Sequence, residues 1–215
     1  EPAVVQAGPV KLPVPPASSR CHELDNVEKC QAVMTELALE AGLKSAVLTA
    51  VPSEYYKQTL EWRRDLLGAP SINHLCKSMI MENTRLTDEQ VAQGYCKYAC
   101  FTVQYTARMH KERMGWAVRD CVDVARGLAP MARKHYNMRV VDESLNDTLS
   151  GFPHNAVSPL GLATPMPMIL SDEIPKLSGG VFFLGGGHVD IKLKVNCAEF
   201  VEAFMPGIAM FTYDD

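Results

Sequence analysis

The sequence predicts an α+β fold, and three observations lead to this prediction. The chain has 215 residues, of which 47% are hydrophobic and 21% charged, as is typical of one globular unit. A long segment near the N-terminus carries apolar residues at helical spacing, and several short segments are rich in β-branched and aromatic residues. These helical and strand-like segments do not alternate strictly, as they would in a doubly wound parallel sheet.

The N-terminal third contains an arm, two helices and a strand. Residues 1–20 include five prolines without a helical period, which predicts an extended tail or an arm lying over the domain. From residue 22 to residue 41, apolar positions recur at spacings of three and four, which predicts an amphipathic helix that stops at Gly42. Residues 45–51 form a short apolar run typical of a buried strand. Residues 53–68 are predicted to be a helix capped by its first serine and ended by its last glycine.

The remaining elements follow from similar patterns. Strands are predicted at residues 74–81, 98–107 and 138–141 and around the run GGVFFLGGGHVDIKLKV; helices are predicted at a capping box from Thr87 to Gln90, at residues 111–128 and after Asn196. We expect the rest of the C-terminal half to be strand and loop. The organisation expected is a Pro-rich arm at 1–20, a helical element with one strand at 21–70 and the main domain at 71–215, forming one globular unit.

Charge limits the partners of the chain. The net charge is −4 and the isoelectric point is about 5.9, which argues against a protein that coats nucleic acid with a generally basic surface. Any RNA contact must therefore be local. The following basic residues could face phosphate, although most basic residues simply solvate helices: Lys57, Arg63, Arg64, Arg108, Lys111, Arg113, Arg126, Arg133, Lys134 and Arg139.

Cysteine usage and hydropathy indicate the compartment. The seven cysteines are irregularly spaced and none forms a C-x-x-C pair, which predicts reduced thiols in a cytosol-like compartment. Cys96 and Cys100 lie four apart, but no second pair follows at zinc spacing, so small core residues are expected and no metal or other cofactor. No apolar run approaches the roughly 20 residues that span a bilayer, and residues 1–20 lack the features of a signal peptide. We expect a cytoplasmic protein without a membrane or DNA partner.

Four features attract attention as candidate site residues. Lys77 is a single cation within the apolar run LCKSMIM; it must pair, snorkel or serve a ligand, or it is an ordinary edge-strand lysine. The segment PHNAVSPLG predicts a rigid loop whose backbone donors can point at a ligand, or else a surface turn. The run Gly185-Gly186-Gly187 lacks the helix of a phosphate-binding loop, so a tight turn is the better interpretation.

The fourth feature is the segment that follows the glycine run. Alternation would place Asp190, Lys192 and Lys194 on one side of a strand, most simply a solvated face of a sheet. His188 could pair with Asp190 or be a surface histidine. No order of residues suitable for a Ser-His-Asp or Cys-His catalytic group can be identified, and no G-x-S-x-G motif is present. The residue patterns alone therefore predict an α+β domain and no particular function.

Three of these segments occur together in an order that resembles the YbaK/prolyl-tRNA-synthetase-associated editing domains. They are LCKSMIM, SGFPHNAVSPLGLATPMPMIL and FFLGGGHVDIKLKVNCAEFVEAF, and the joint similarity covers roughly residues 70 to 205. The chain as a whole is most similar to the eukaryotic stand-alone members. The resemblance implies a mixed, barrel-like β-sheet with flanking helices, here with an added N-terminal helix. It also implies hydrolysis of the ester between an amino acid and the terminal adenosine of a mischarged tRNA, a reaction that serves translation fidelity.

The resemblance also implies roles for individual residues. Lys77 matches the functional lysine of the family, which would hold the terminal phosphate or orient the ester. Asp190 matches an acidic position near the pocket and is the second candidate catalytic residue. The substrate-binding candidates are Asn155, Ala156, Val157, Ser158, Pro159, Gly185, Gly186, Gly187 and His188. Loop amides would stabilise the developing oxyanion, so the mechanism would need no metal.

Two departures from the family pattern bear on activity. Asn155 stands where the loop motif usually begins with glycine, so its backbone must adopt the left-handed conformation or follow another path. Phe183 stands where bacterial stand-alone members tend to have serine. Two functions are therefore carried forward: a trans-acting deacylase for a tRNA(Pro)-type substrate bearing a small amino acid, and a catalytically silent module bound to an aminoacyl-tRNA synthetase complex.

Overall fold

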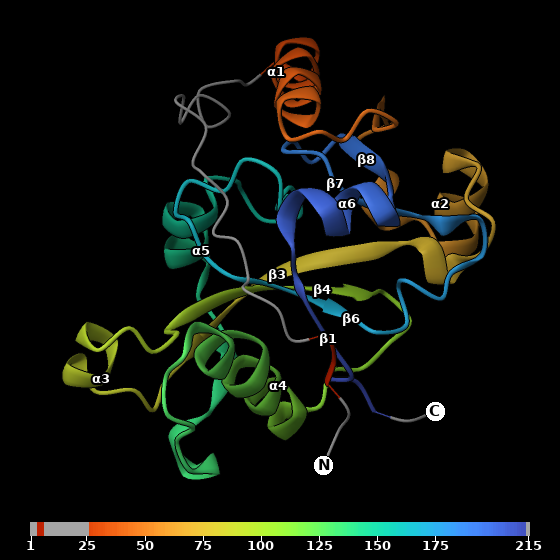
Figure 1. The fold of residues 1–215 in the computed structure, drawn as a ribbon. Helices are drawn as coiled ribbons and strands as arrows, with labels where there is room; N and C mark the ends of the chain where they lie inside the picture. Colours follow the sequence, from red (N-terminus) through yellow and green to blue (C-terminus); the bar gives the residue numbers. More distant parts are fainter. Residues whose placement is uncertain (1–3, 7–25, 214–215) are drawn as a thin grey trace.

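The computed structural model describes residues 4–6 and 26–213, and these residues adopt the predicted α+β fold. Two β-sheets are packed together with helices on the outside, and they do not close into a barrel (Figure 1). The long strand β3 crosses the middle of the molecule, with α1, α6 and the smaller sheet on one side of it and α4 on the other (Figure 1).

The larger sheet has six strands in the order β1-β9-β6-β4-β3-β5. Its strands are β1 (Val4–Gln6), β9 (Gly207–Ala209), β6 (Met168–Ser171), β4 (Tyr98–Gln104), β3 (Cys76–Asn83) and β5 (Met138–Val140). β6 runs parallel to β4 and β9, and the other neighbouring strands are antiparallel. β5 pairs only with residues 81–83 of β3, so the first half of β3 has no partner in β5 along this edge of the sheet.

The smaller sheet has three strands in the order β2-β8-β7. They are β2 (Val47–Ala50), β8 (Ile191–Asn196) and β7 (Val181–Gly185), and both pairs are antiparallel. A single parallel bridge between Leu75 and Phe183 connects β7 to the start of β3. Between this bridge and the beginning of β5, the edge of β3 borders the cavity described below.

Helices begin and end where local chemistry favours it. They are α1 (Val27–Glu40), α2 (Leu60–Leu67), α3 (Asp88–Ala92), α4 (Lys111–Val118), α5 (Glu143–Ser150) and α6 (Cys197–Phe204). The predicted capping box of α3 is present, since Thr87 accepts from the Gln90 backbone and the Gln90 side chain accepts from the Thr87 backbone. Asn196 caps α6 as predicted, by accepting from the backbone N–H of Ala198 and of Glu199.

Two apolar cores lie on opposite faces of the larger sheet. The first joins α1, α6 and the smaller sheet to residues such as Ile80 and Cys100. The second joins α4 to the opposite face, through residues such as Met81, Phe101 and Met138. Because successive strand residues point to opposite faces, the two cores alternate along β3 and β4. A side chain of β3 can therefore be assigned to one side of the sheet from its position alone.

The structure corrects several predicted elements. Thr59 rather than Ser53 caps α2, and residues 55–57 form a separate 3₁₀ turn. Of the helix predicted at 111–128, only the part up to Val118 is α-helical; a π turn and a 3₁₀ turn follow it. Helix α5 lies in a region where only strand and loop were expected, because ESLNDTLS has few apolar residues to reveal a helical period.

The N-terminal predictions are tested only in part. Val4–Gln6 of the predicted arm form β1 and pair with β9, while the rest of residues 1–20 and the predicted helical residues 22–25 lie outside the described residues. The six cysteines within the described part of the chain are buried, Cys96 and Cys100 among them. Among the residues that the structure describes, no helix is long and apolar enough to cross a membrane.

Candidate active site

A cavity of about 420 Å³ lies at the free edge of β3. β3 contributes residues 77–80, the end of β5 and the start of α5 contribute one side, and the loop at residues 154–157 with Gly185 of β7 contributes the other. The cavity thus lies along the part of β3 between its bridge to β7 at Leu75 and its pairing with β5 at residue 81. Its volume lies within the range of pockets that take small ligands.

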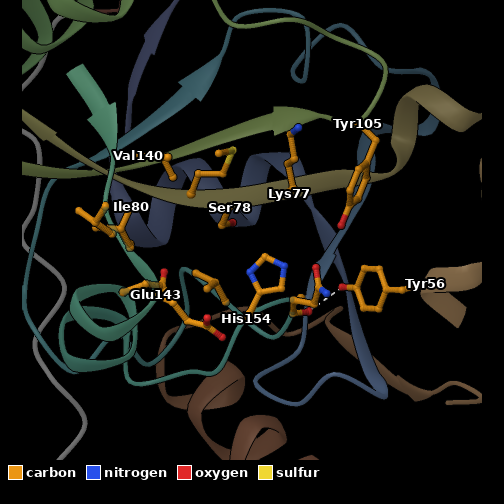
Figure 2. Close-up of a pocket in the computed structure, with 14 residues that line it drawn as sticks. Tyr56, Lys77, Ser78, Ile80, Tyr105, Val140, Glu143 and His154 are labelled. Atoms are coloured by element: carbon orange, nitrogen blue, oxygen red, sulfur yellow. Dashed lines mark hydrogen bonds between the residues drawn. The ribbon is translucent and has the colours of Figure 1, made fainter. Parts of the chain in front are cut away.

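Lys77 and Ser78 lie on opposite sides of β3 at this cavity. Figure 2 shows the Lys77 side chain directed away from Ser78, with His154 and Tyr56 on the Ser78 side. Alternation agrees, because Lys77 has the same parity as Met81, which packs in the α4 core. The Lys77 ammonium lies 5.7 Å from the centroid of the Tyr105 ring. Lys77 is therefore at the rim of the cavity on the α4 side.

The predicted loop forms the wall opposite β3. Asn155 has a φ of 67°, so it adopts the left-handed conformation that was one of the two expected paths. The carbonyl oxygen of Ala156 accepts a hydrogen bond from the N–H of Gly187 at 3.1 Å, which joins this loop to the glycine run. Ser158 is fully buried and its hydroxyl accepts from the N–H of Leu160. The loop is thus held by a hydrogen bond to the glycine run as well as by one within itself, and it is not a free surface turn.

The glycine run is a tight turn that makes room for this loop. A Cβ atom at Gly185 would lie 2.4 Å from the carbonyl oxygen of Val157, so only glycine fits there without a shift. The N–H of Gly186 donates to the carbonyl oxygen of Ile191 at 3.0 Å, and Gly187 has a φ of 87°. The turn interpretation is confirmed, and its function in the fold is to allow β7 to approach the loop closely.

A buried lysine stands behind the cavity wall. The Lys192 ammonium donates hydrogen bonds to the Tyr56 hydroxyl at 3.0 Å and to the Val189 carbonyl oxygen at 2.9 Å. It also lies 4.9 Å and 4.4 Å from the ring centroids of Tyr55 and Tyr56. Burial lowers the pKa of Lys192 to about 7; the Asp190 carboxylate opposes this shift and the Arg63 guanidinium adds to it.

Tyr56 connects this lysine to the loop at residues 154–157. Its hydroxyl lines the cavity and donates a hydrogen bond of 2.6 Å to the carbonyl oxygen of Asn155, drawn as a dashed line in Figure 2. Burial raises the pKa of the Tyr56 phenol above its usual range, with a further contribution from Tyr105. The phenol therefore stays neutral at physiological pH and acts as a hydrogen-bond bridge between Lys192 and the loop.

The solvated-face interpretation of the Asp190-Lys192-Lys194 segment is wrong for Lys192. Only 4% of Lys192 is exposed, because Tyr55 and Tyr56, which precede it by more than 130 residues, cover that face of β8. β8 is also the central strand of its sheet. The predicted alternation of polar and apolar residues along β8 is correct. The residues that cover its polar face, however, come from a distant segment that no local pattern reveals.

The predicted site residues divide into three groups. Lys77, Asn155, Val157 and Gly185 line the cavity directly. Ala156, Ser158, Pro159, Gly186 and Gly187 are buried next to these residues and support the wall. His188 and Asp190 do not line the cavity. The His188 Nδ1 atom accepts a hydrogen bond from the Asp190 backbone N–H, so His188 pairs with the main chain of Asp190 and not with its carboxylate. The Asp190 carboxylate is close enough to Lys192 to oppose the lowering of the pKa of its ammonium.

Several lining residues were not predicted from the sequence. His154 belongs to the predicted loop but precedes the part carried by the resemblance, and Figure 2 shows its ring between β3 and the loop. Glu143 lies at the start of α5, and Tyr105 follows β4. Imidazole and carboxylate side chains are common general acids and bases in enzymes, so the cavity contains the kinds of group that acid–base chemistry uses.

The cavity is lined by ionisable and polar side chains of several kinds. Residues 4–6 and 26–213 contain no cluster of three or more histidine, cysteine, aspartate or glutamate side chains able to hold a metal ion. The cavity instead offers one cation, one carboxylate, one imidazole and phenol hydroxyls, from Lys77, Glu143, His154, Tyr56 and Tyr105. Such a set can bind a polar ligand and move a proton.

Comparison with known proteins places the fold among solved structures. The sequence matches no family model and no curated protein. A proposed trans-editing enzyme for prolyl-tRNA synthetase aligns with a TM-score of 0.67 and 14% identity over 88% of this chain and 100% of its own. A scaffold protein used for epitope backbone grafting aligns with a TM-score of 0.64 and 14% identity over 86% of this chain and 98% of its own. A hypothetical protein aligns with a TM-score of 0.58 and 19% identity over 83% of this chain and 98% of its own. The chain therefore has the fold of a protein described as a trans-editing enzyme.

Proposed function

We propose that the chain is a trans-acting deacylase that hydrolyses the ester of a mischarged aminoacyl-tRNA. One observation carries the proposal: the cavity at the edge of β3 gathers Lys77, the loop at 154–157 and Gly185, which are the segments that the family resemblance selects. The similarity to a proposed trans-editing enzyme supports it at the level of the fold. The cytoplasm, where translation occurs, is the compartment that fits this function.

The two sides of β3 suggest how the substrate would lie. Lys77 stands at the rim on the α4 side, where its ammonium would bind the phosphate of the terminal nucleotide. The aminoacyl group would enter the space between Ser78 and the loop, where Asn155 and Val157 line the wall. The volume of about 420 Å³ suits a small amino acid with part of the terminal adenosine.

Hydrolysis then needs a proton acceptor and support for the oxyanion. His154 would take a proton from water as the water oxygen attacks the ester carbonyl carbon. Backbone N–H groups of the loop would stabilise the developing oxyanion. When the bond between the carbonyl carbon and the ribose oxygen breaks, the proton passes from His154 to that oxygen, which yields free amino acid and uncharged tRNA.

The experiment that tests this function is release of amino acid from a panel of charged tRNAs. The purified protein is incubated with alanyl-, cysteinyl- and prolyl-tRNA(Pro), each labelled in the amino acid, and loss of the ester is followed against buffer alone. We expect faster loss for one of the two smaller non-cognate amino acids than for proline. Absence of release across the panel would reject the deacylase and favour a binding module associated with a synthetase.

A further inference from the structure

A second hollow, on the α4 side of the larger sheet, gathers positive charge. Arg85, Lys111, Arg133 and Lys134 line a hollow of about 460 Å³ together with Glu112, Tyr136 and Asn137, and we refer to it as the basic cleft. All four cations are exposed. The chain as a whole has a net charge of −4, so this local excess of positive charge departs from the rest of the molecule.

Most of this charge is available to a ligand. Glu112 is the carboxylate in the lining, and it forms an ion pair with Arg133. Within the described part of the chain, no ion pair engages Arg85, Lys111 or Lys134. The side chain of Asn137 adds a neutral polar group beside the cations. Exposed cations with an amide group are the usual ligands of phosphate oxygens.

The basic cleft and the cavity are connected along β5. Asn137 lines the cleft and Val140 lines the cavity, and a separation of three residues along an extended chain is about 10 Å. Arg139 is exposed between them. Val140 has the same parity as Met138, which packs in the α4 core, so Val140, like Lys77, lies on the α4 side of the sheet. By the same parity Arg139 points to the other face of the sheet, so it is β5 itself that joins the basic cleft to the α4 side on which Lys77 stands.

We propose that the basic cleft binds the sugar-phosphate backbone at the acceptor end of a tRNA whose terminal adenosine occupies the cavity. This inference rests on the proposed function. At about 3.4 Å per nucleotide in a stacked strand, 10 Å corresponds to about three nucleotides, so the cleft lies within reach of the phosphates that precede the terminal residue. Several cations around one hollow suit a chain of repeated phosphates, whereas a single phosphorylated side chain would engage only part of them.

The test measures binding of uncharged tRNA and so does not depend on hydrolysis. The double variant Lys111→Glu/Lys134→Glu is compared with Lys29→Glu/Lys44→Glu, which makes the same change of net charge on exposed lysines in the first turn of α1 and in the turn that follows this helix. We expect the cleft variant to bind tRNA at least 10-fold more weakly than the wild type. Its plot of log affinity against log salt should be less steep by about two, since each lysine accounts for about one.

The control variant should bind within about 2-fold of the wild type, and thermal melting should show that both variants fold. Equal weakening in the two variants would show that net charge alone governs binding and would overturn the inference, as would wild-type affinity in the cleft variant or no salt-dependent tRNA binding by the wild type. Failure of the proposed function would appear separately, as absence of ester hydrolysis by a protein whose cleft still binds tRNA.

Discussion

Replacing Lys77 by alanine is expected to lower kcat/KM for ester hydrolysis by roughly 10- to 100-fold while leaving the fold intact. A hydrogen bond to a charged group is worth about 1.5–3 kcal/mol, which corresponds to this range of rates. Lys77 lies at the cavity rim, half-buried, and contacts the Tyr105 ring, so its removal leaves no unpaired buried charge behind. The measurement is release of labelled amino acid from the preferred charged tRNA at limiting substrate.

Lys97 provides a matched control for this variant. It is also a half-buried lysine near the larger sheet, with its ammonium 5.4 Å from the centroid of the Tyr98 ring, but it does not line the cavity. Lys97→Ala should retain nearly full activity. If the Lys77→Ala protein melts far below the wild type, or if both variants lose activity equally, Lys77 is a structural residue and the assignment fails.

Replacing Lys192 by methionine is expected to change how stability depends on pH. The pKa of Lys192 is lowered to about 7 in the folded protein, whereas an unfolded lysine titrates near 10.4. Between these values the unfolded chain binds more protons, so the wild type gains stability as pH rises through this window, and below pH 7 the cost of burying the ammonium is fully present. Methionine removes that cost at every pH.

The difference in unfolding free energy, variant minus wild type, should therefore be largest at pH values below about 7. It should decrease by about 1.4 kcal/mol for each pH unit from about 7 towards 10. Urea denaturation at several pH values in this range measures the difference, and Lys194→Met, two residues along β8 and half-buried, is the control. Parallel behaviour of the two variants would contradict the buried position of Lys192.

The sequence predicted those elements whose signal is local. The helical period of α1, the capping box of α3, the Asn196 cap of α6 and the glycine at the end of α2 each depend on a few neighbouring residues. Helix α5 was missed because its eight residues are mostly polar, and the shortening of α4 was missed because the apolar pattern continues through the π turn. Local chemistry thus predicts a helix end where a capping residue marks it, as Gly68 and Asn196 do, and fails where a second residue able to cap lies nearby, as with Ser53 and Thr59.

The sequence predicted those candidate site residues that belong to recognisable local segments. Lys77, Asn155, Val157 and Gly185 were selected from the sequence and come together at one cavity. Tyr56 and Lys192 were missed because their contact joins positions 136 residues apart. Lys192 lies in a segment with a regular polar alternation, which predicts a solvated face, and the tyrosines that cover it come from a distant segment.

The central claim is that the cavity at the edge of β3 holds the aminoacyl end of the tRNA. The most direct measurement is the affinity of a non-hydrolysable aminoacyl-adenosine, with an amide in place of the ester, for the wild type and for Val140→Trp and Val124→Trp. Val140 is 58% exposed and lines the cavity, whereas Val124 is 41% exposed and lies outside it, so both positions tolerate a large ring. We predict saturable binding to the wild type and to Val124→Trp, with at least 10-fold weaker binding to Val140→Trp. Equal affinity for all three proteins would contradict the placement of the substrate in this cavity.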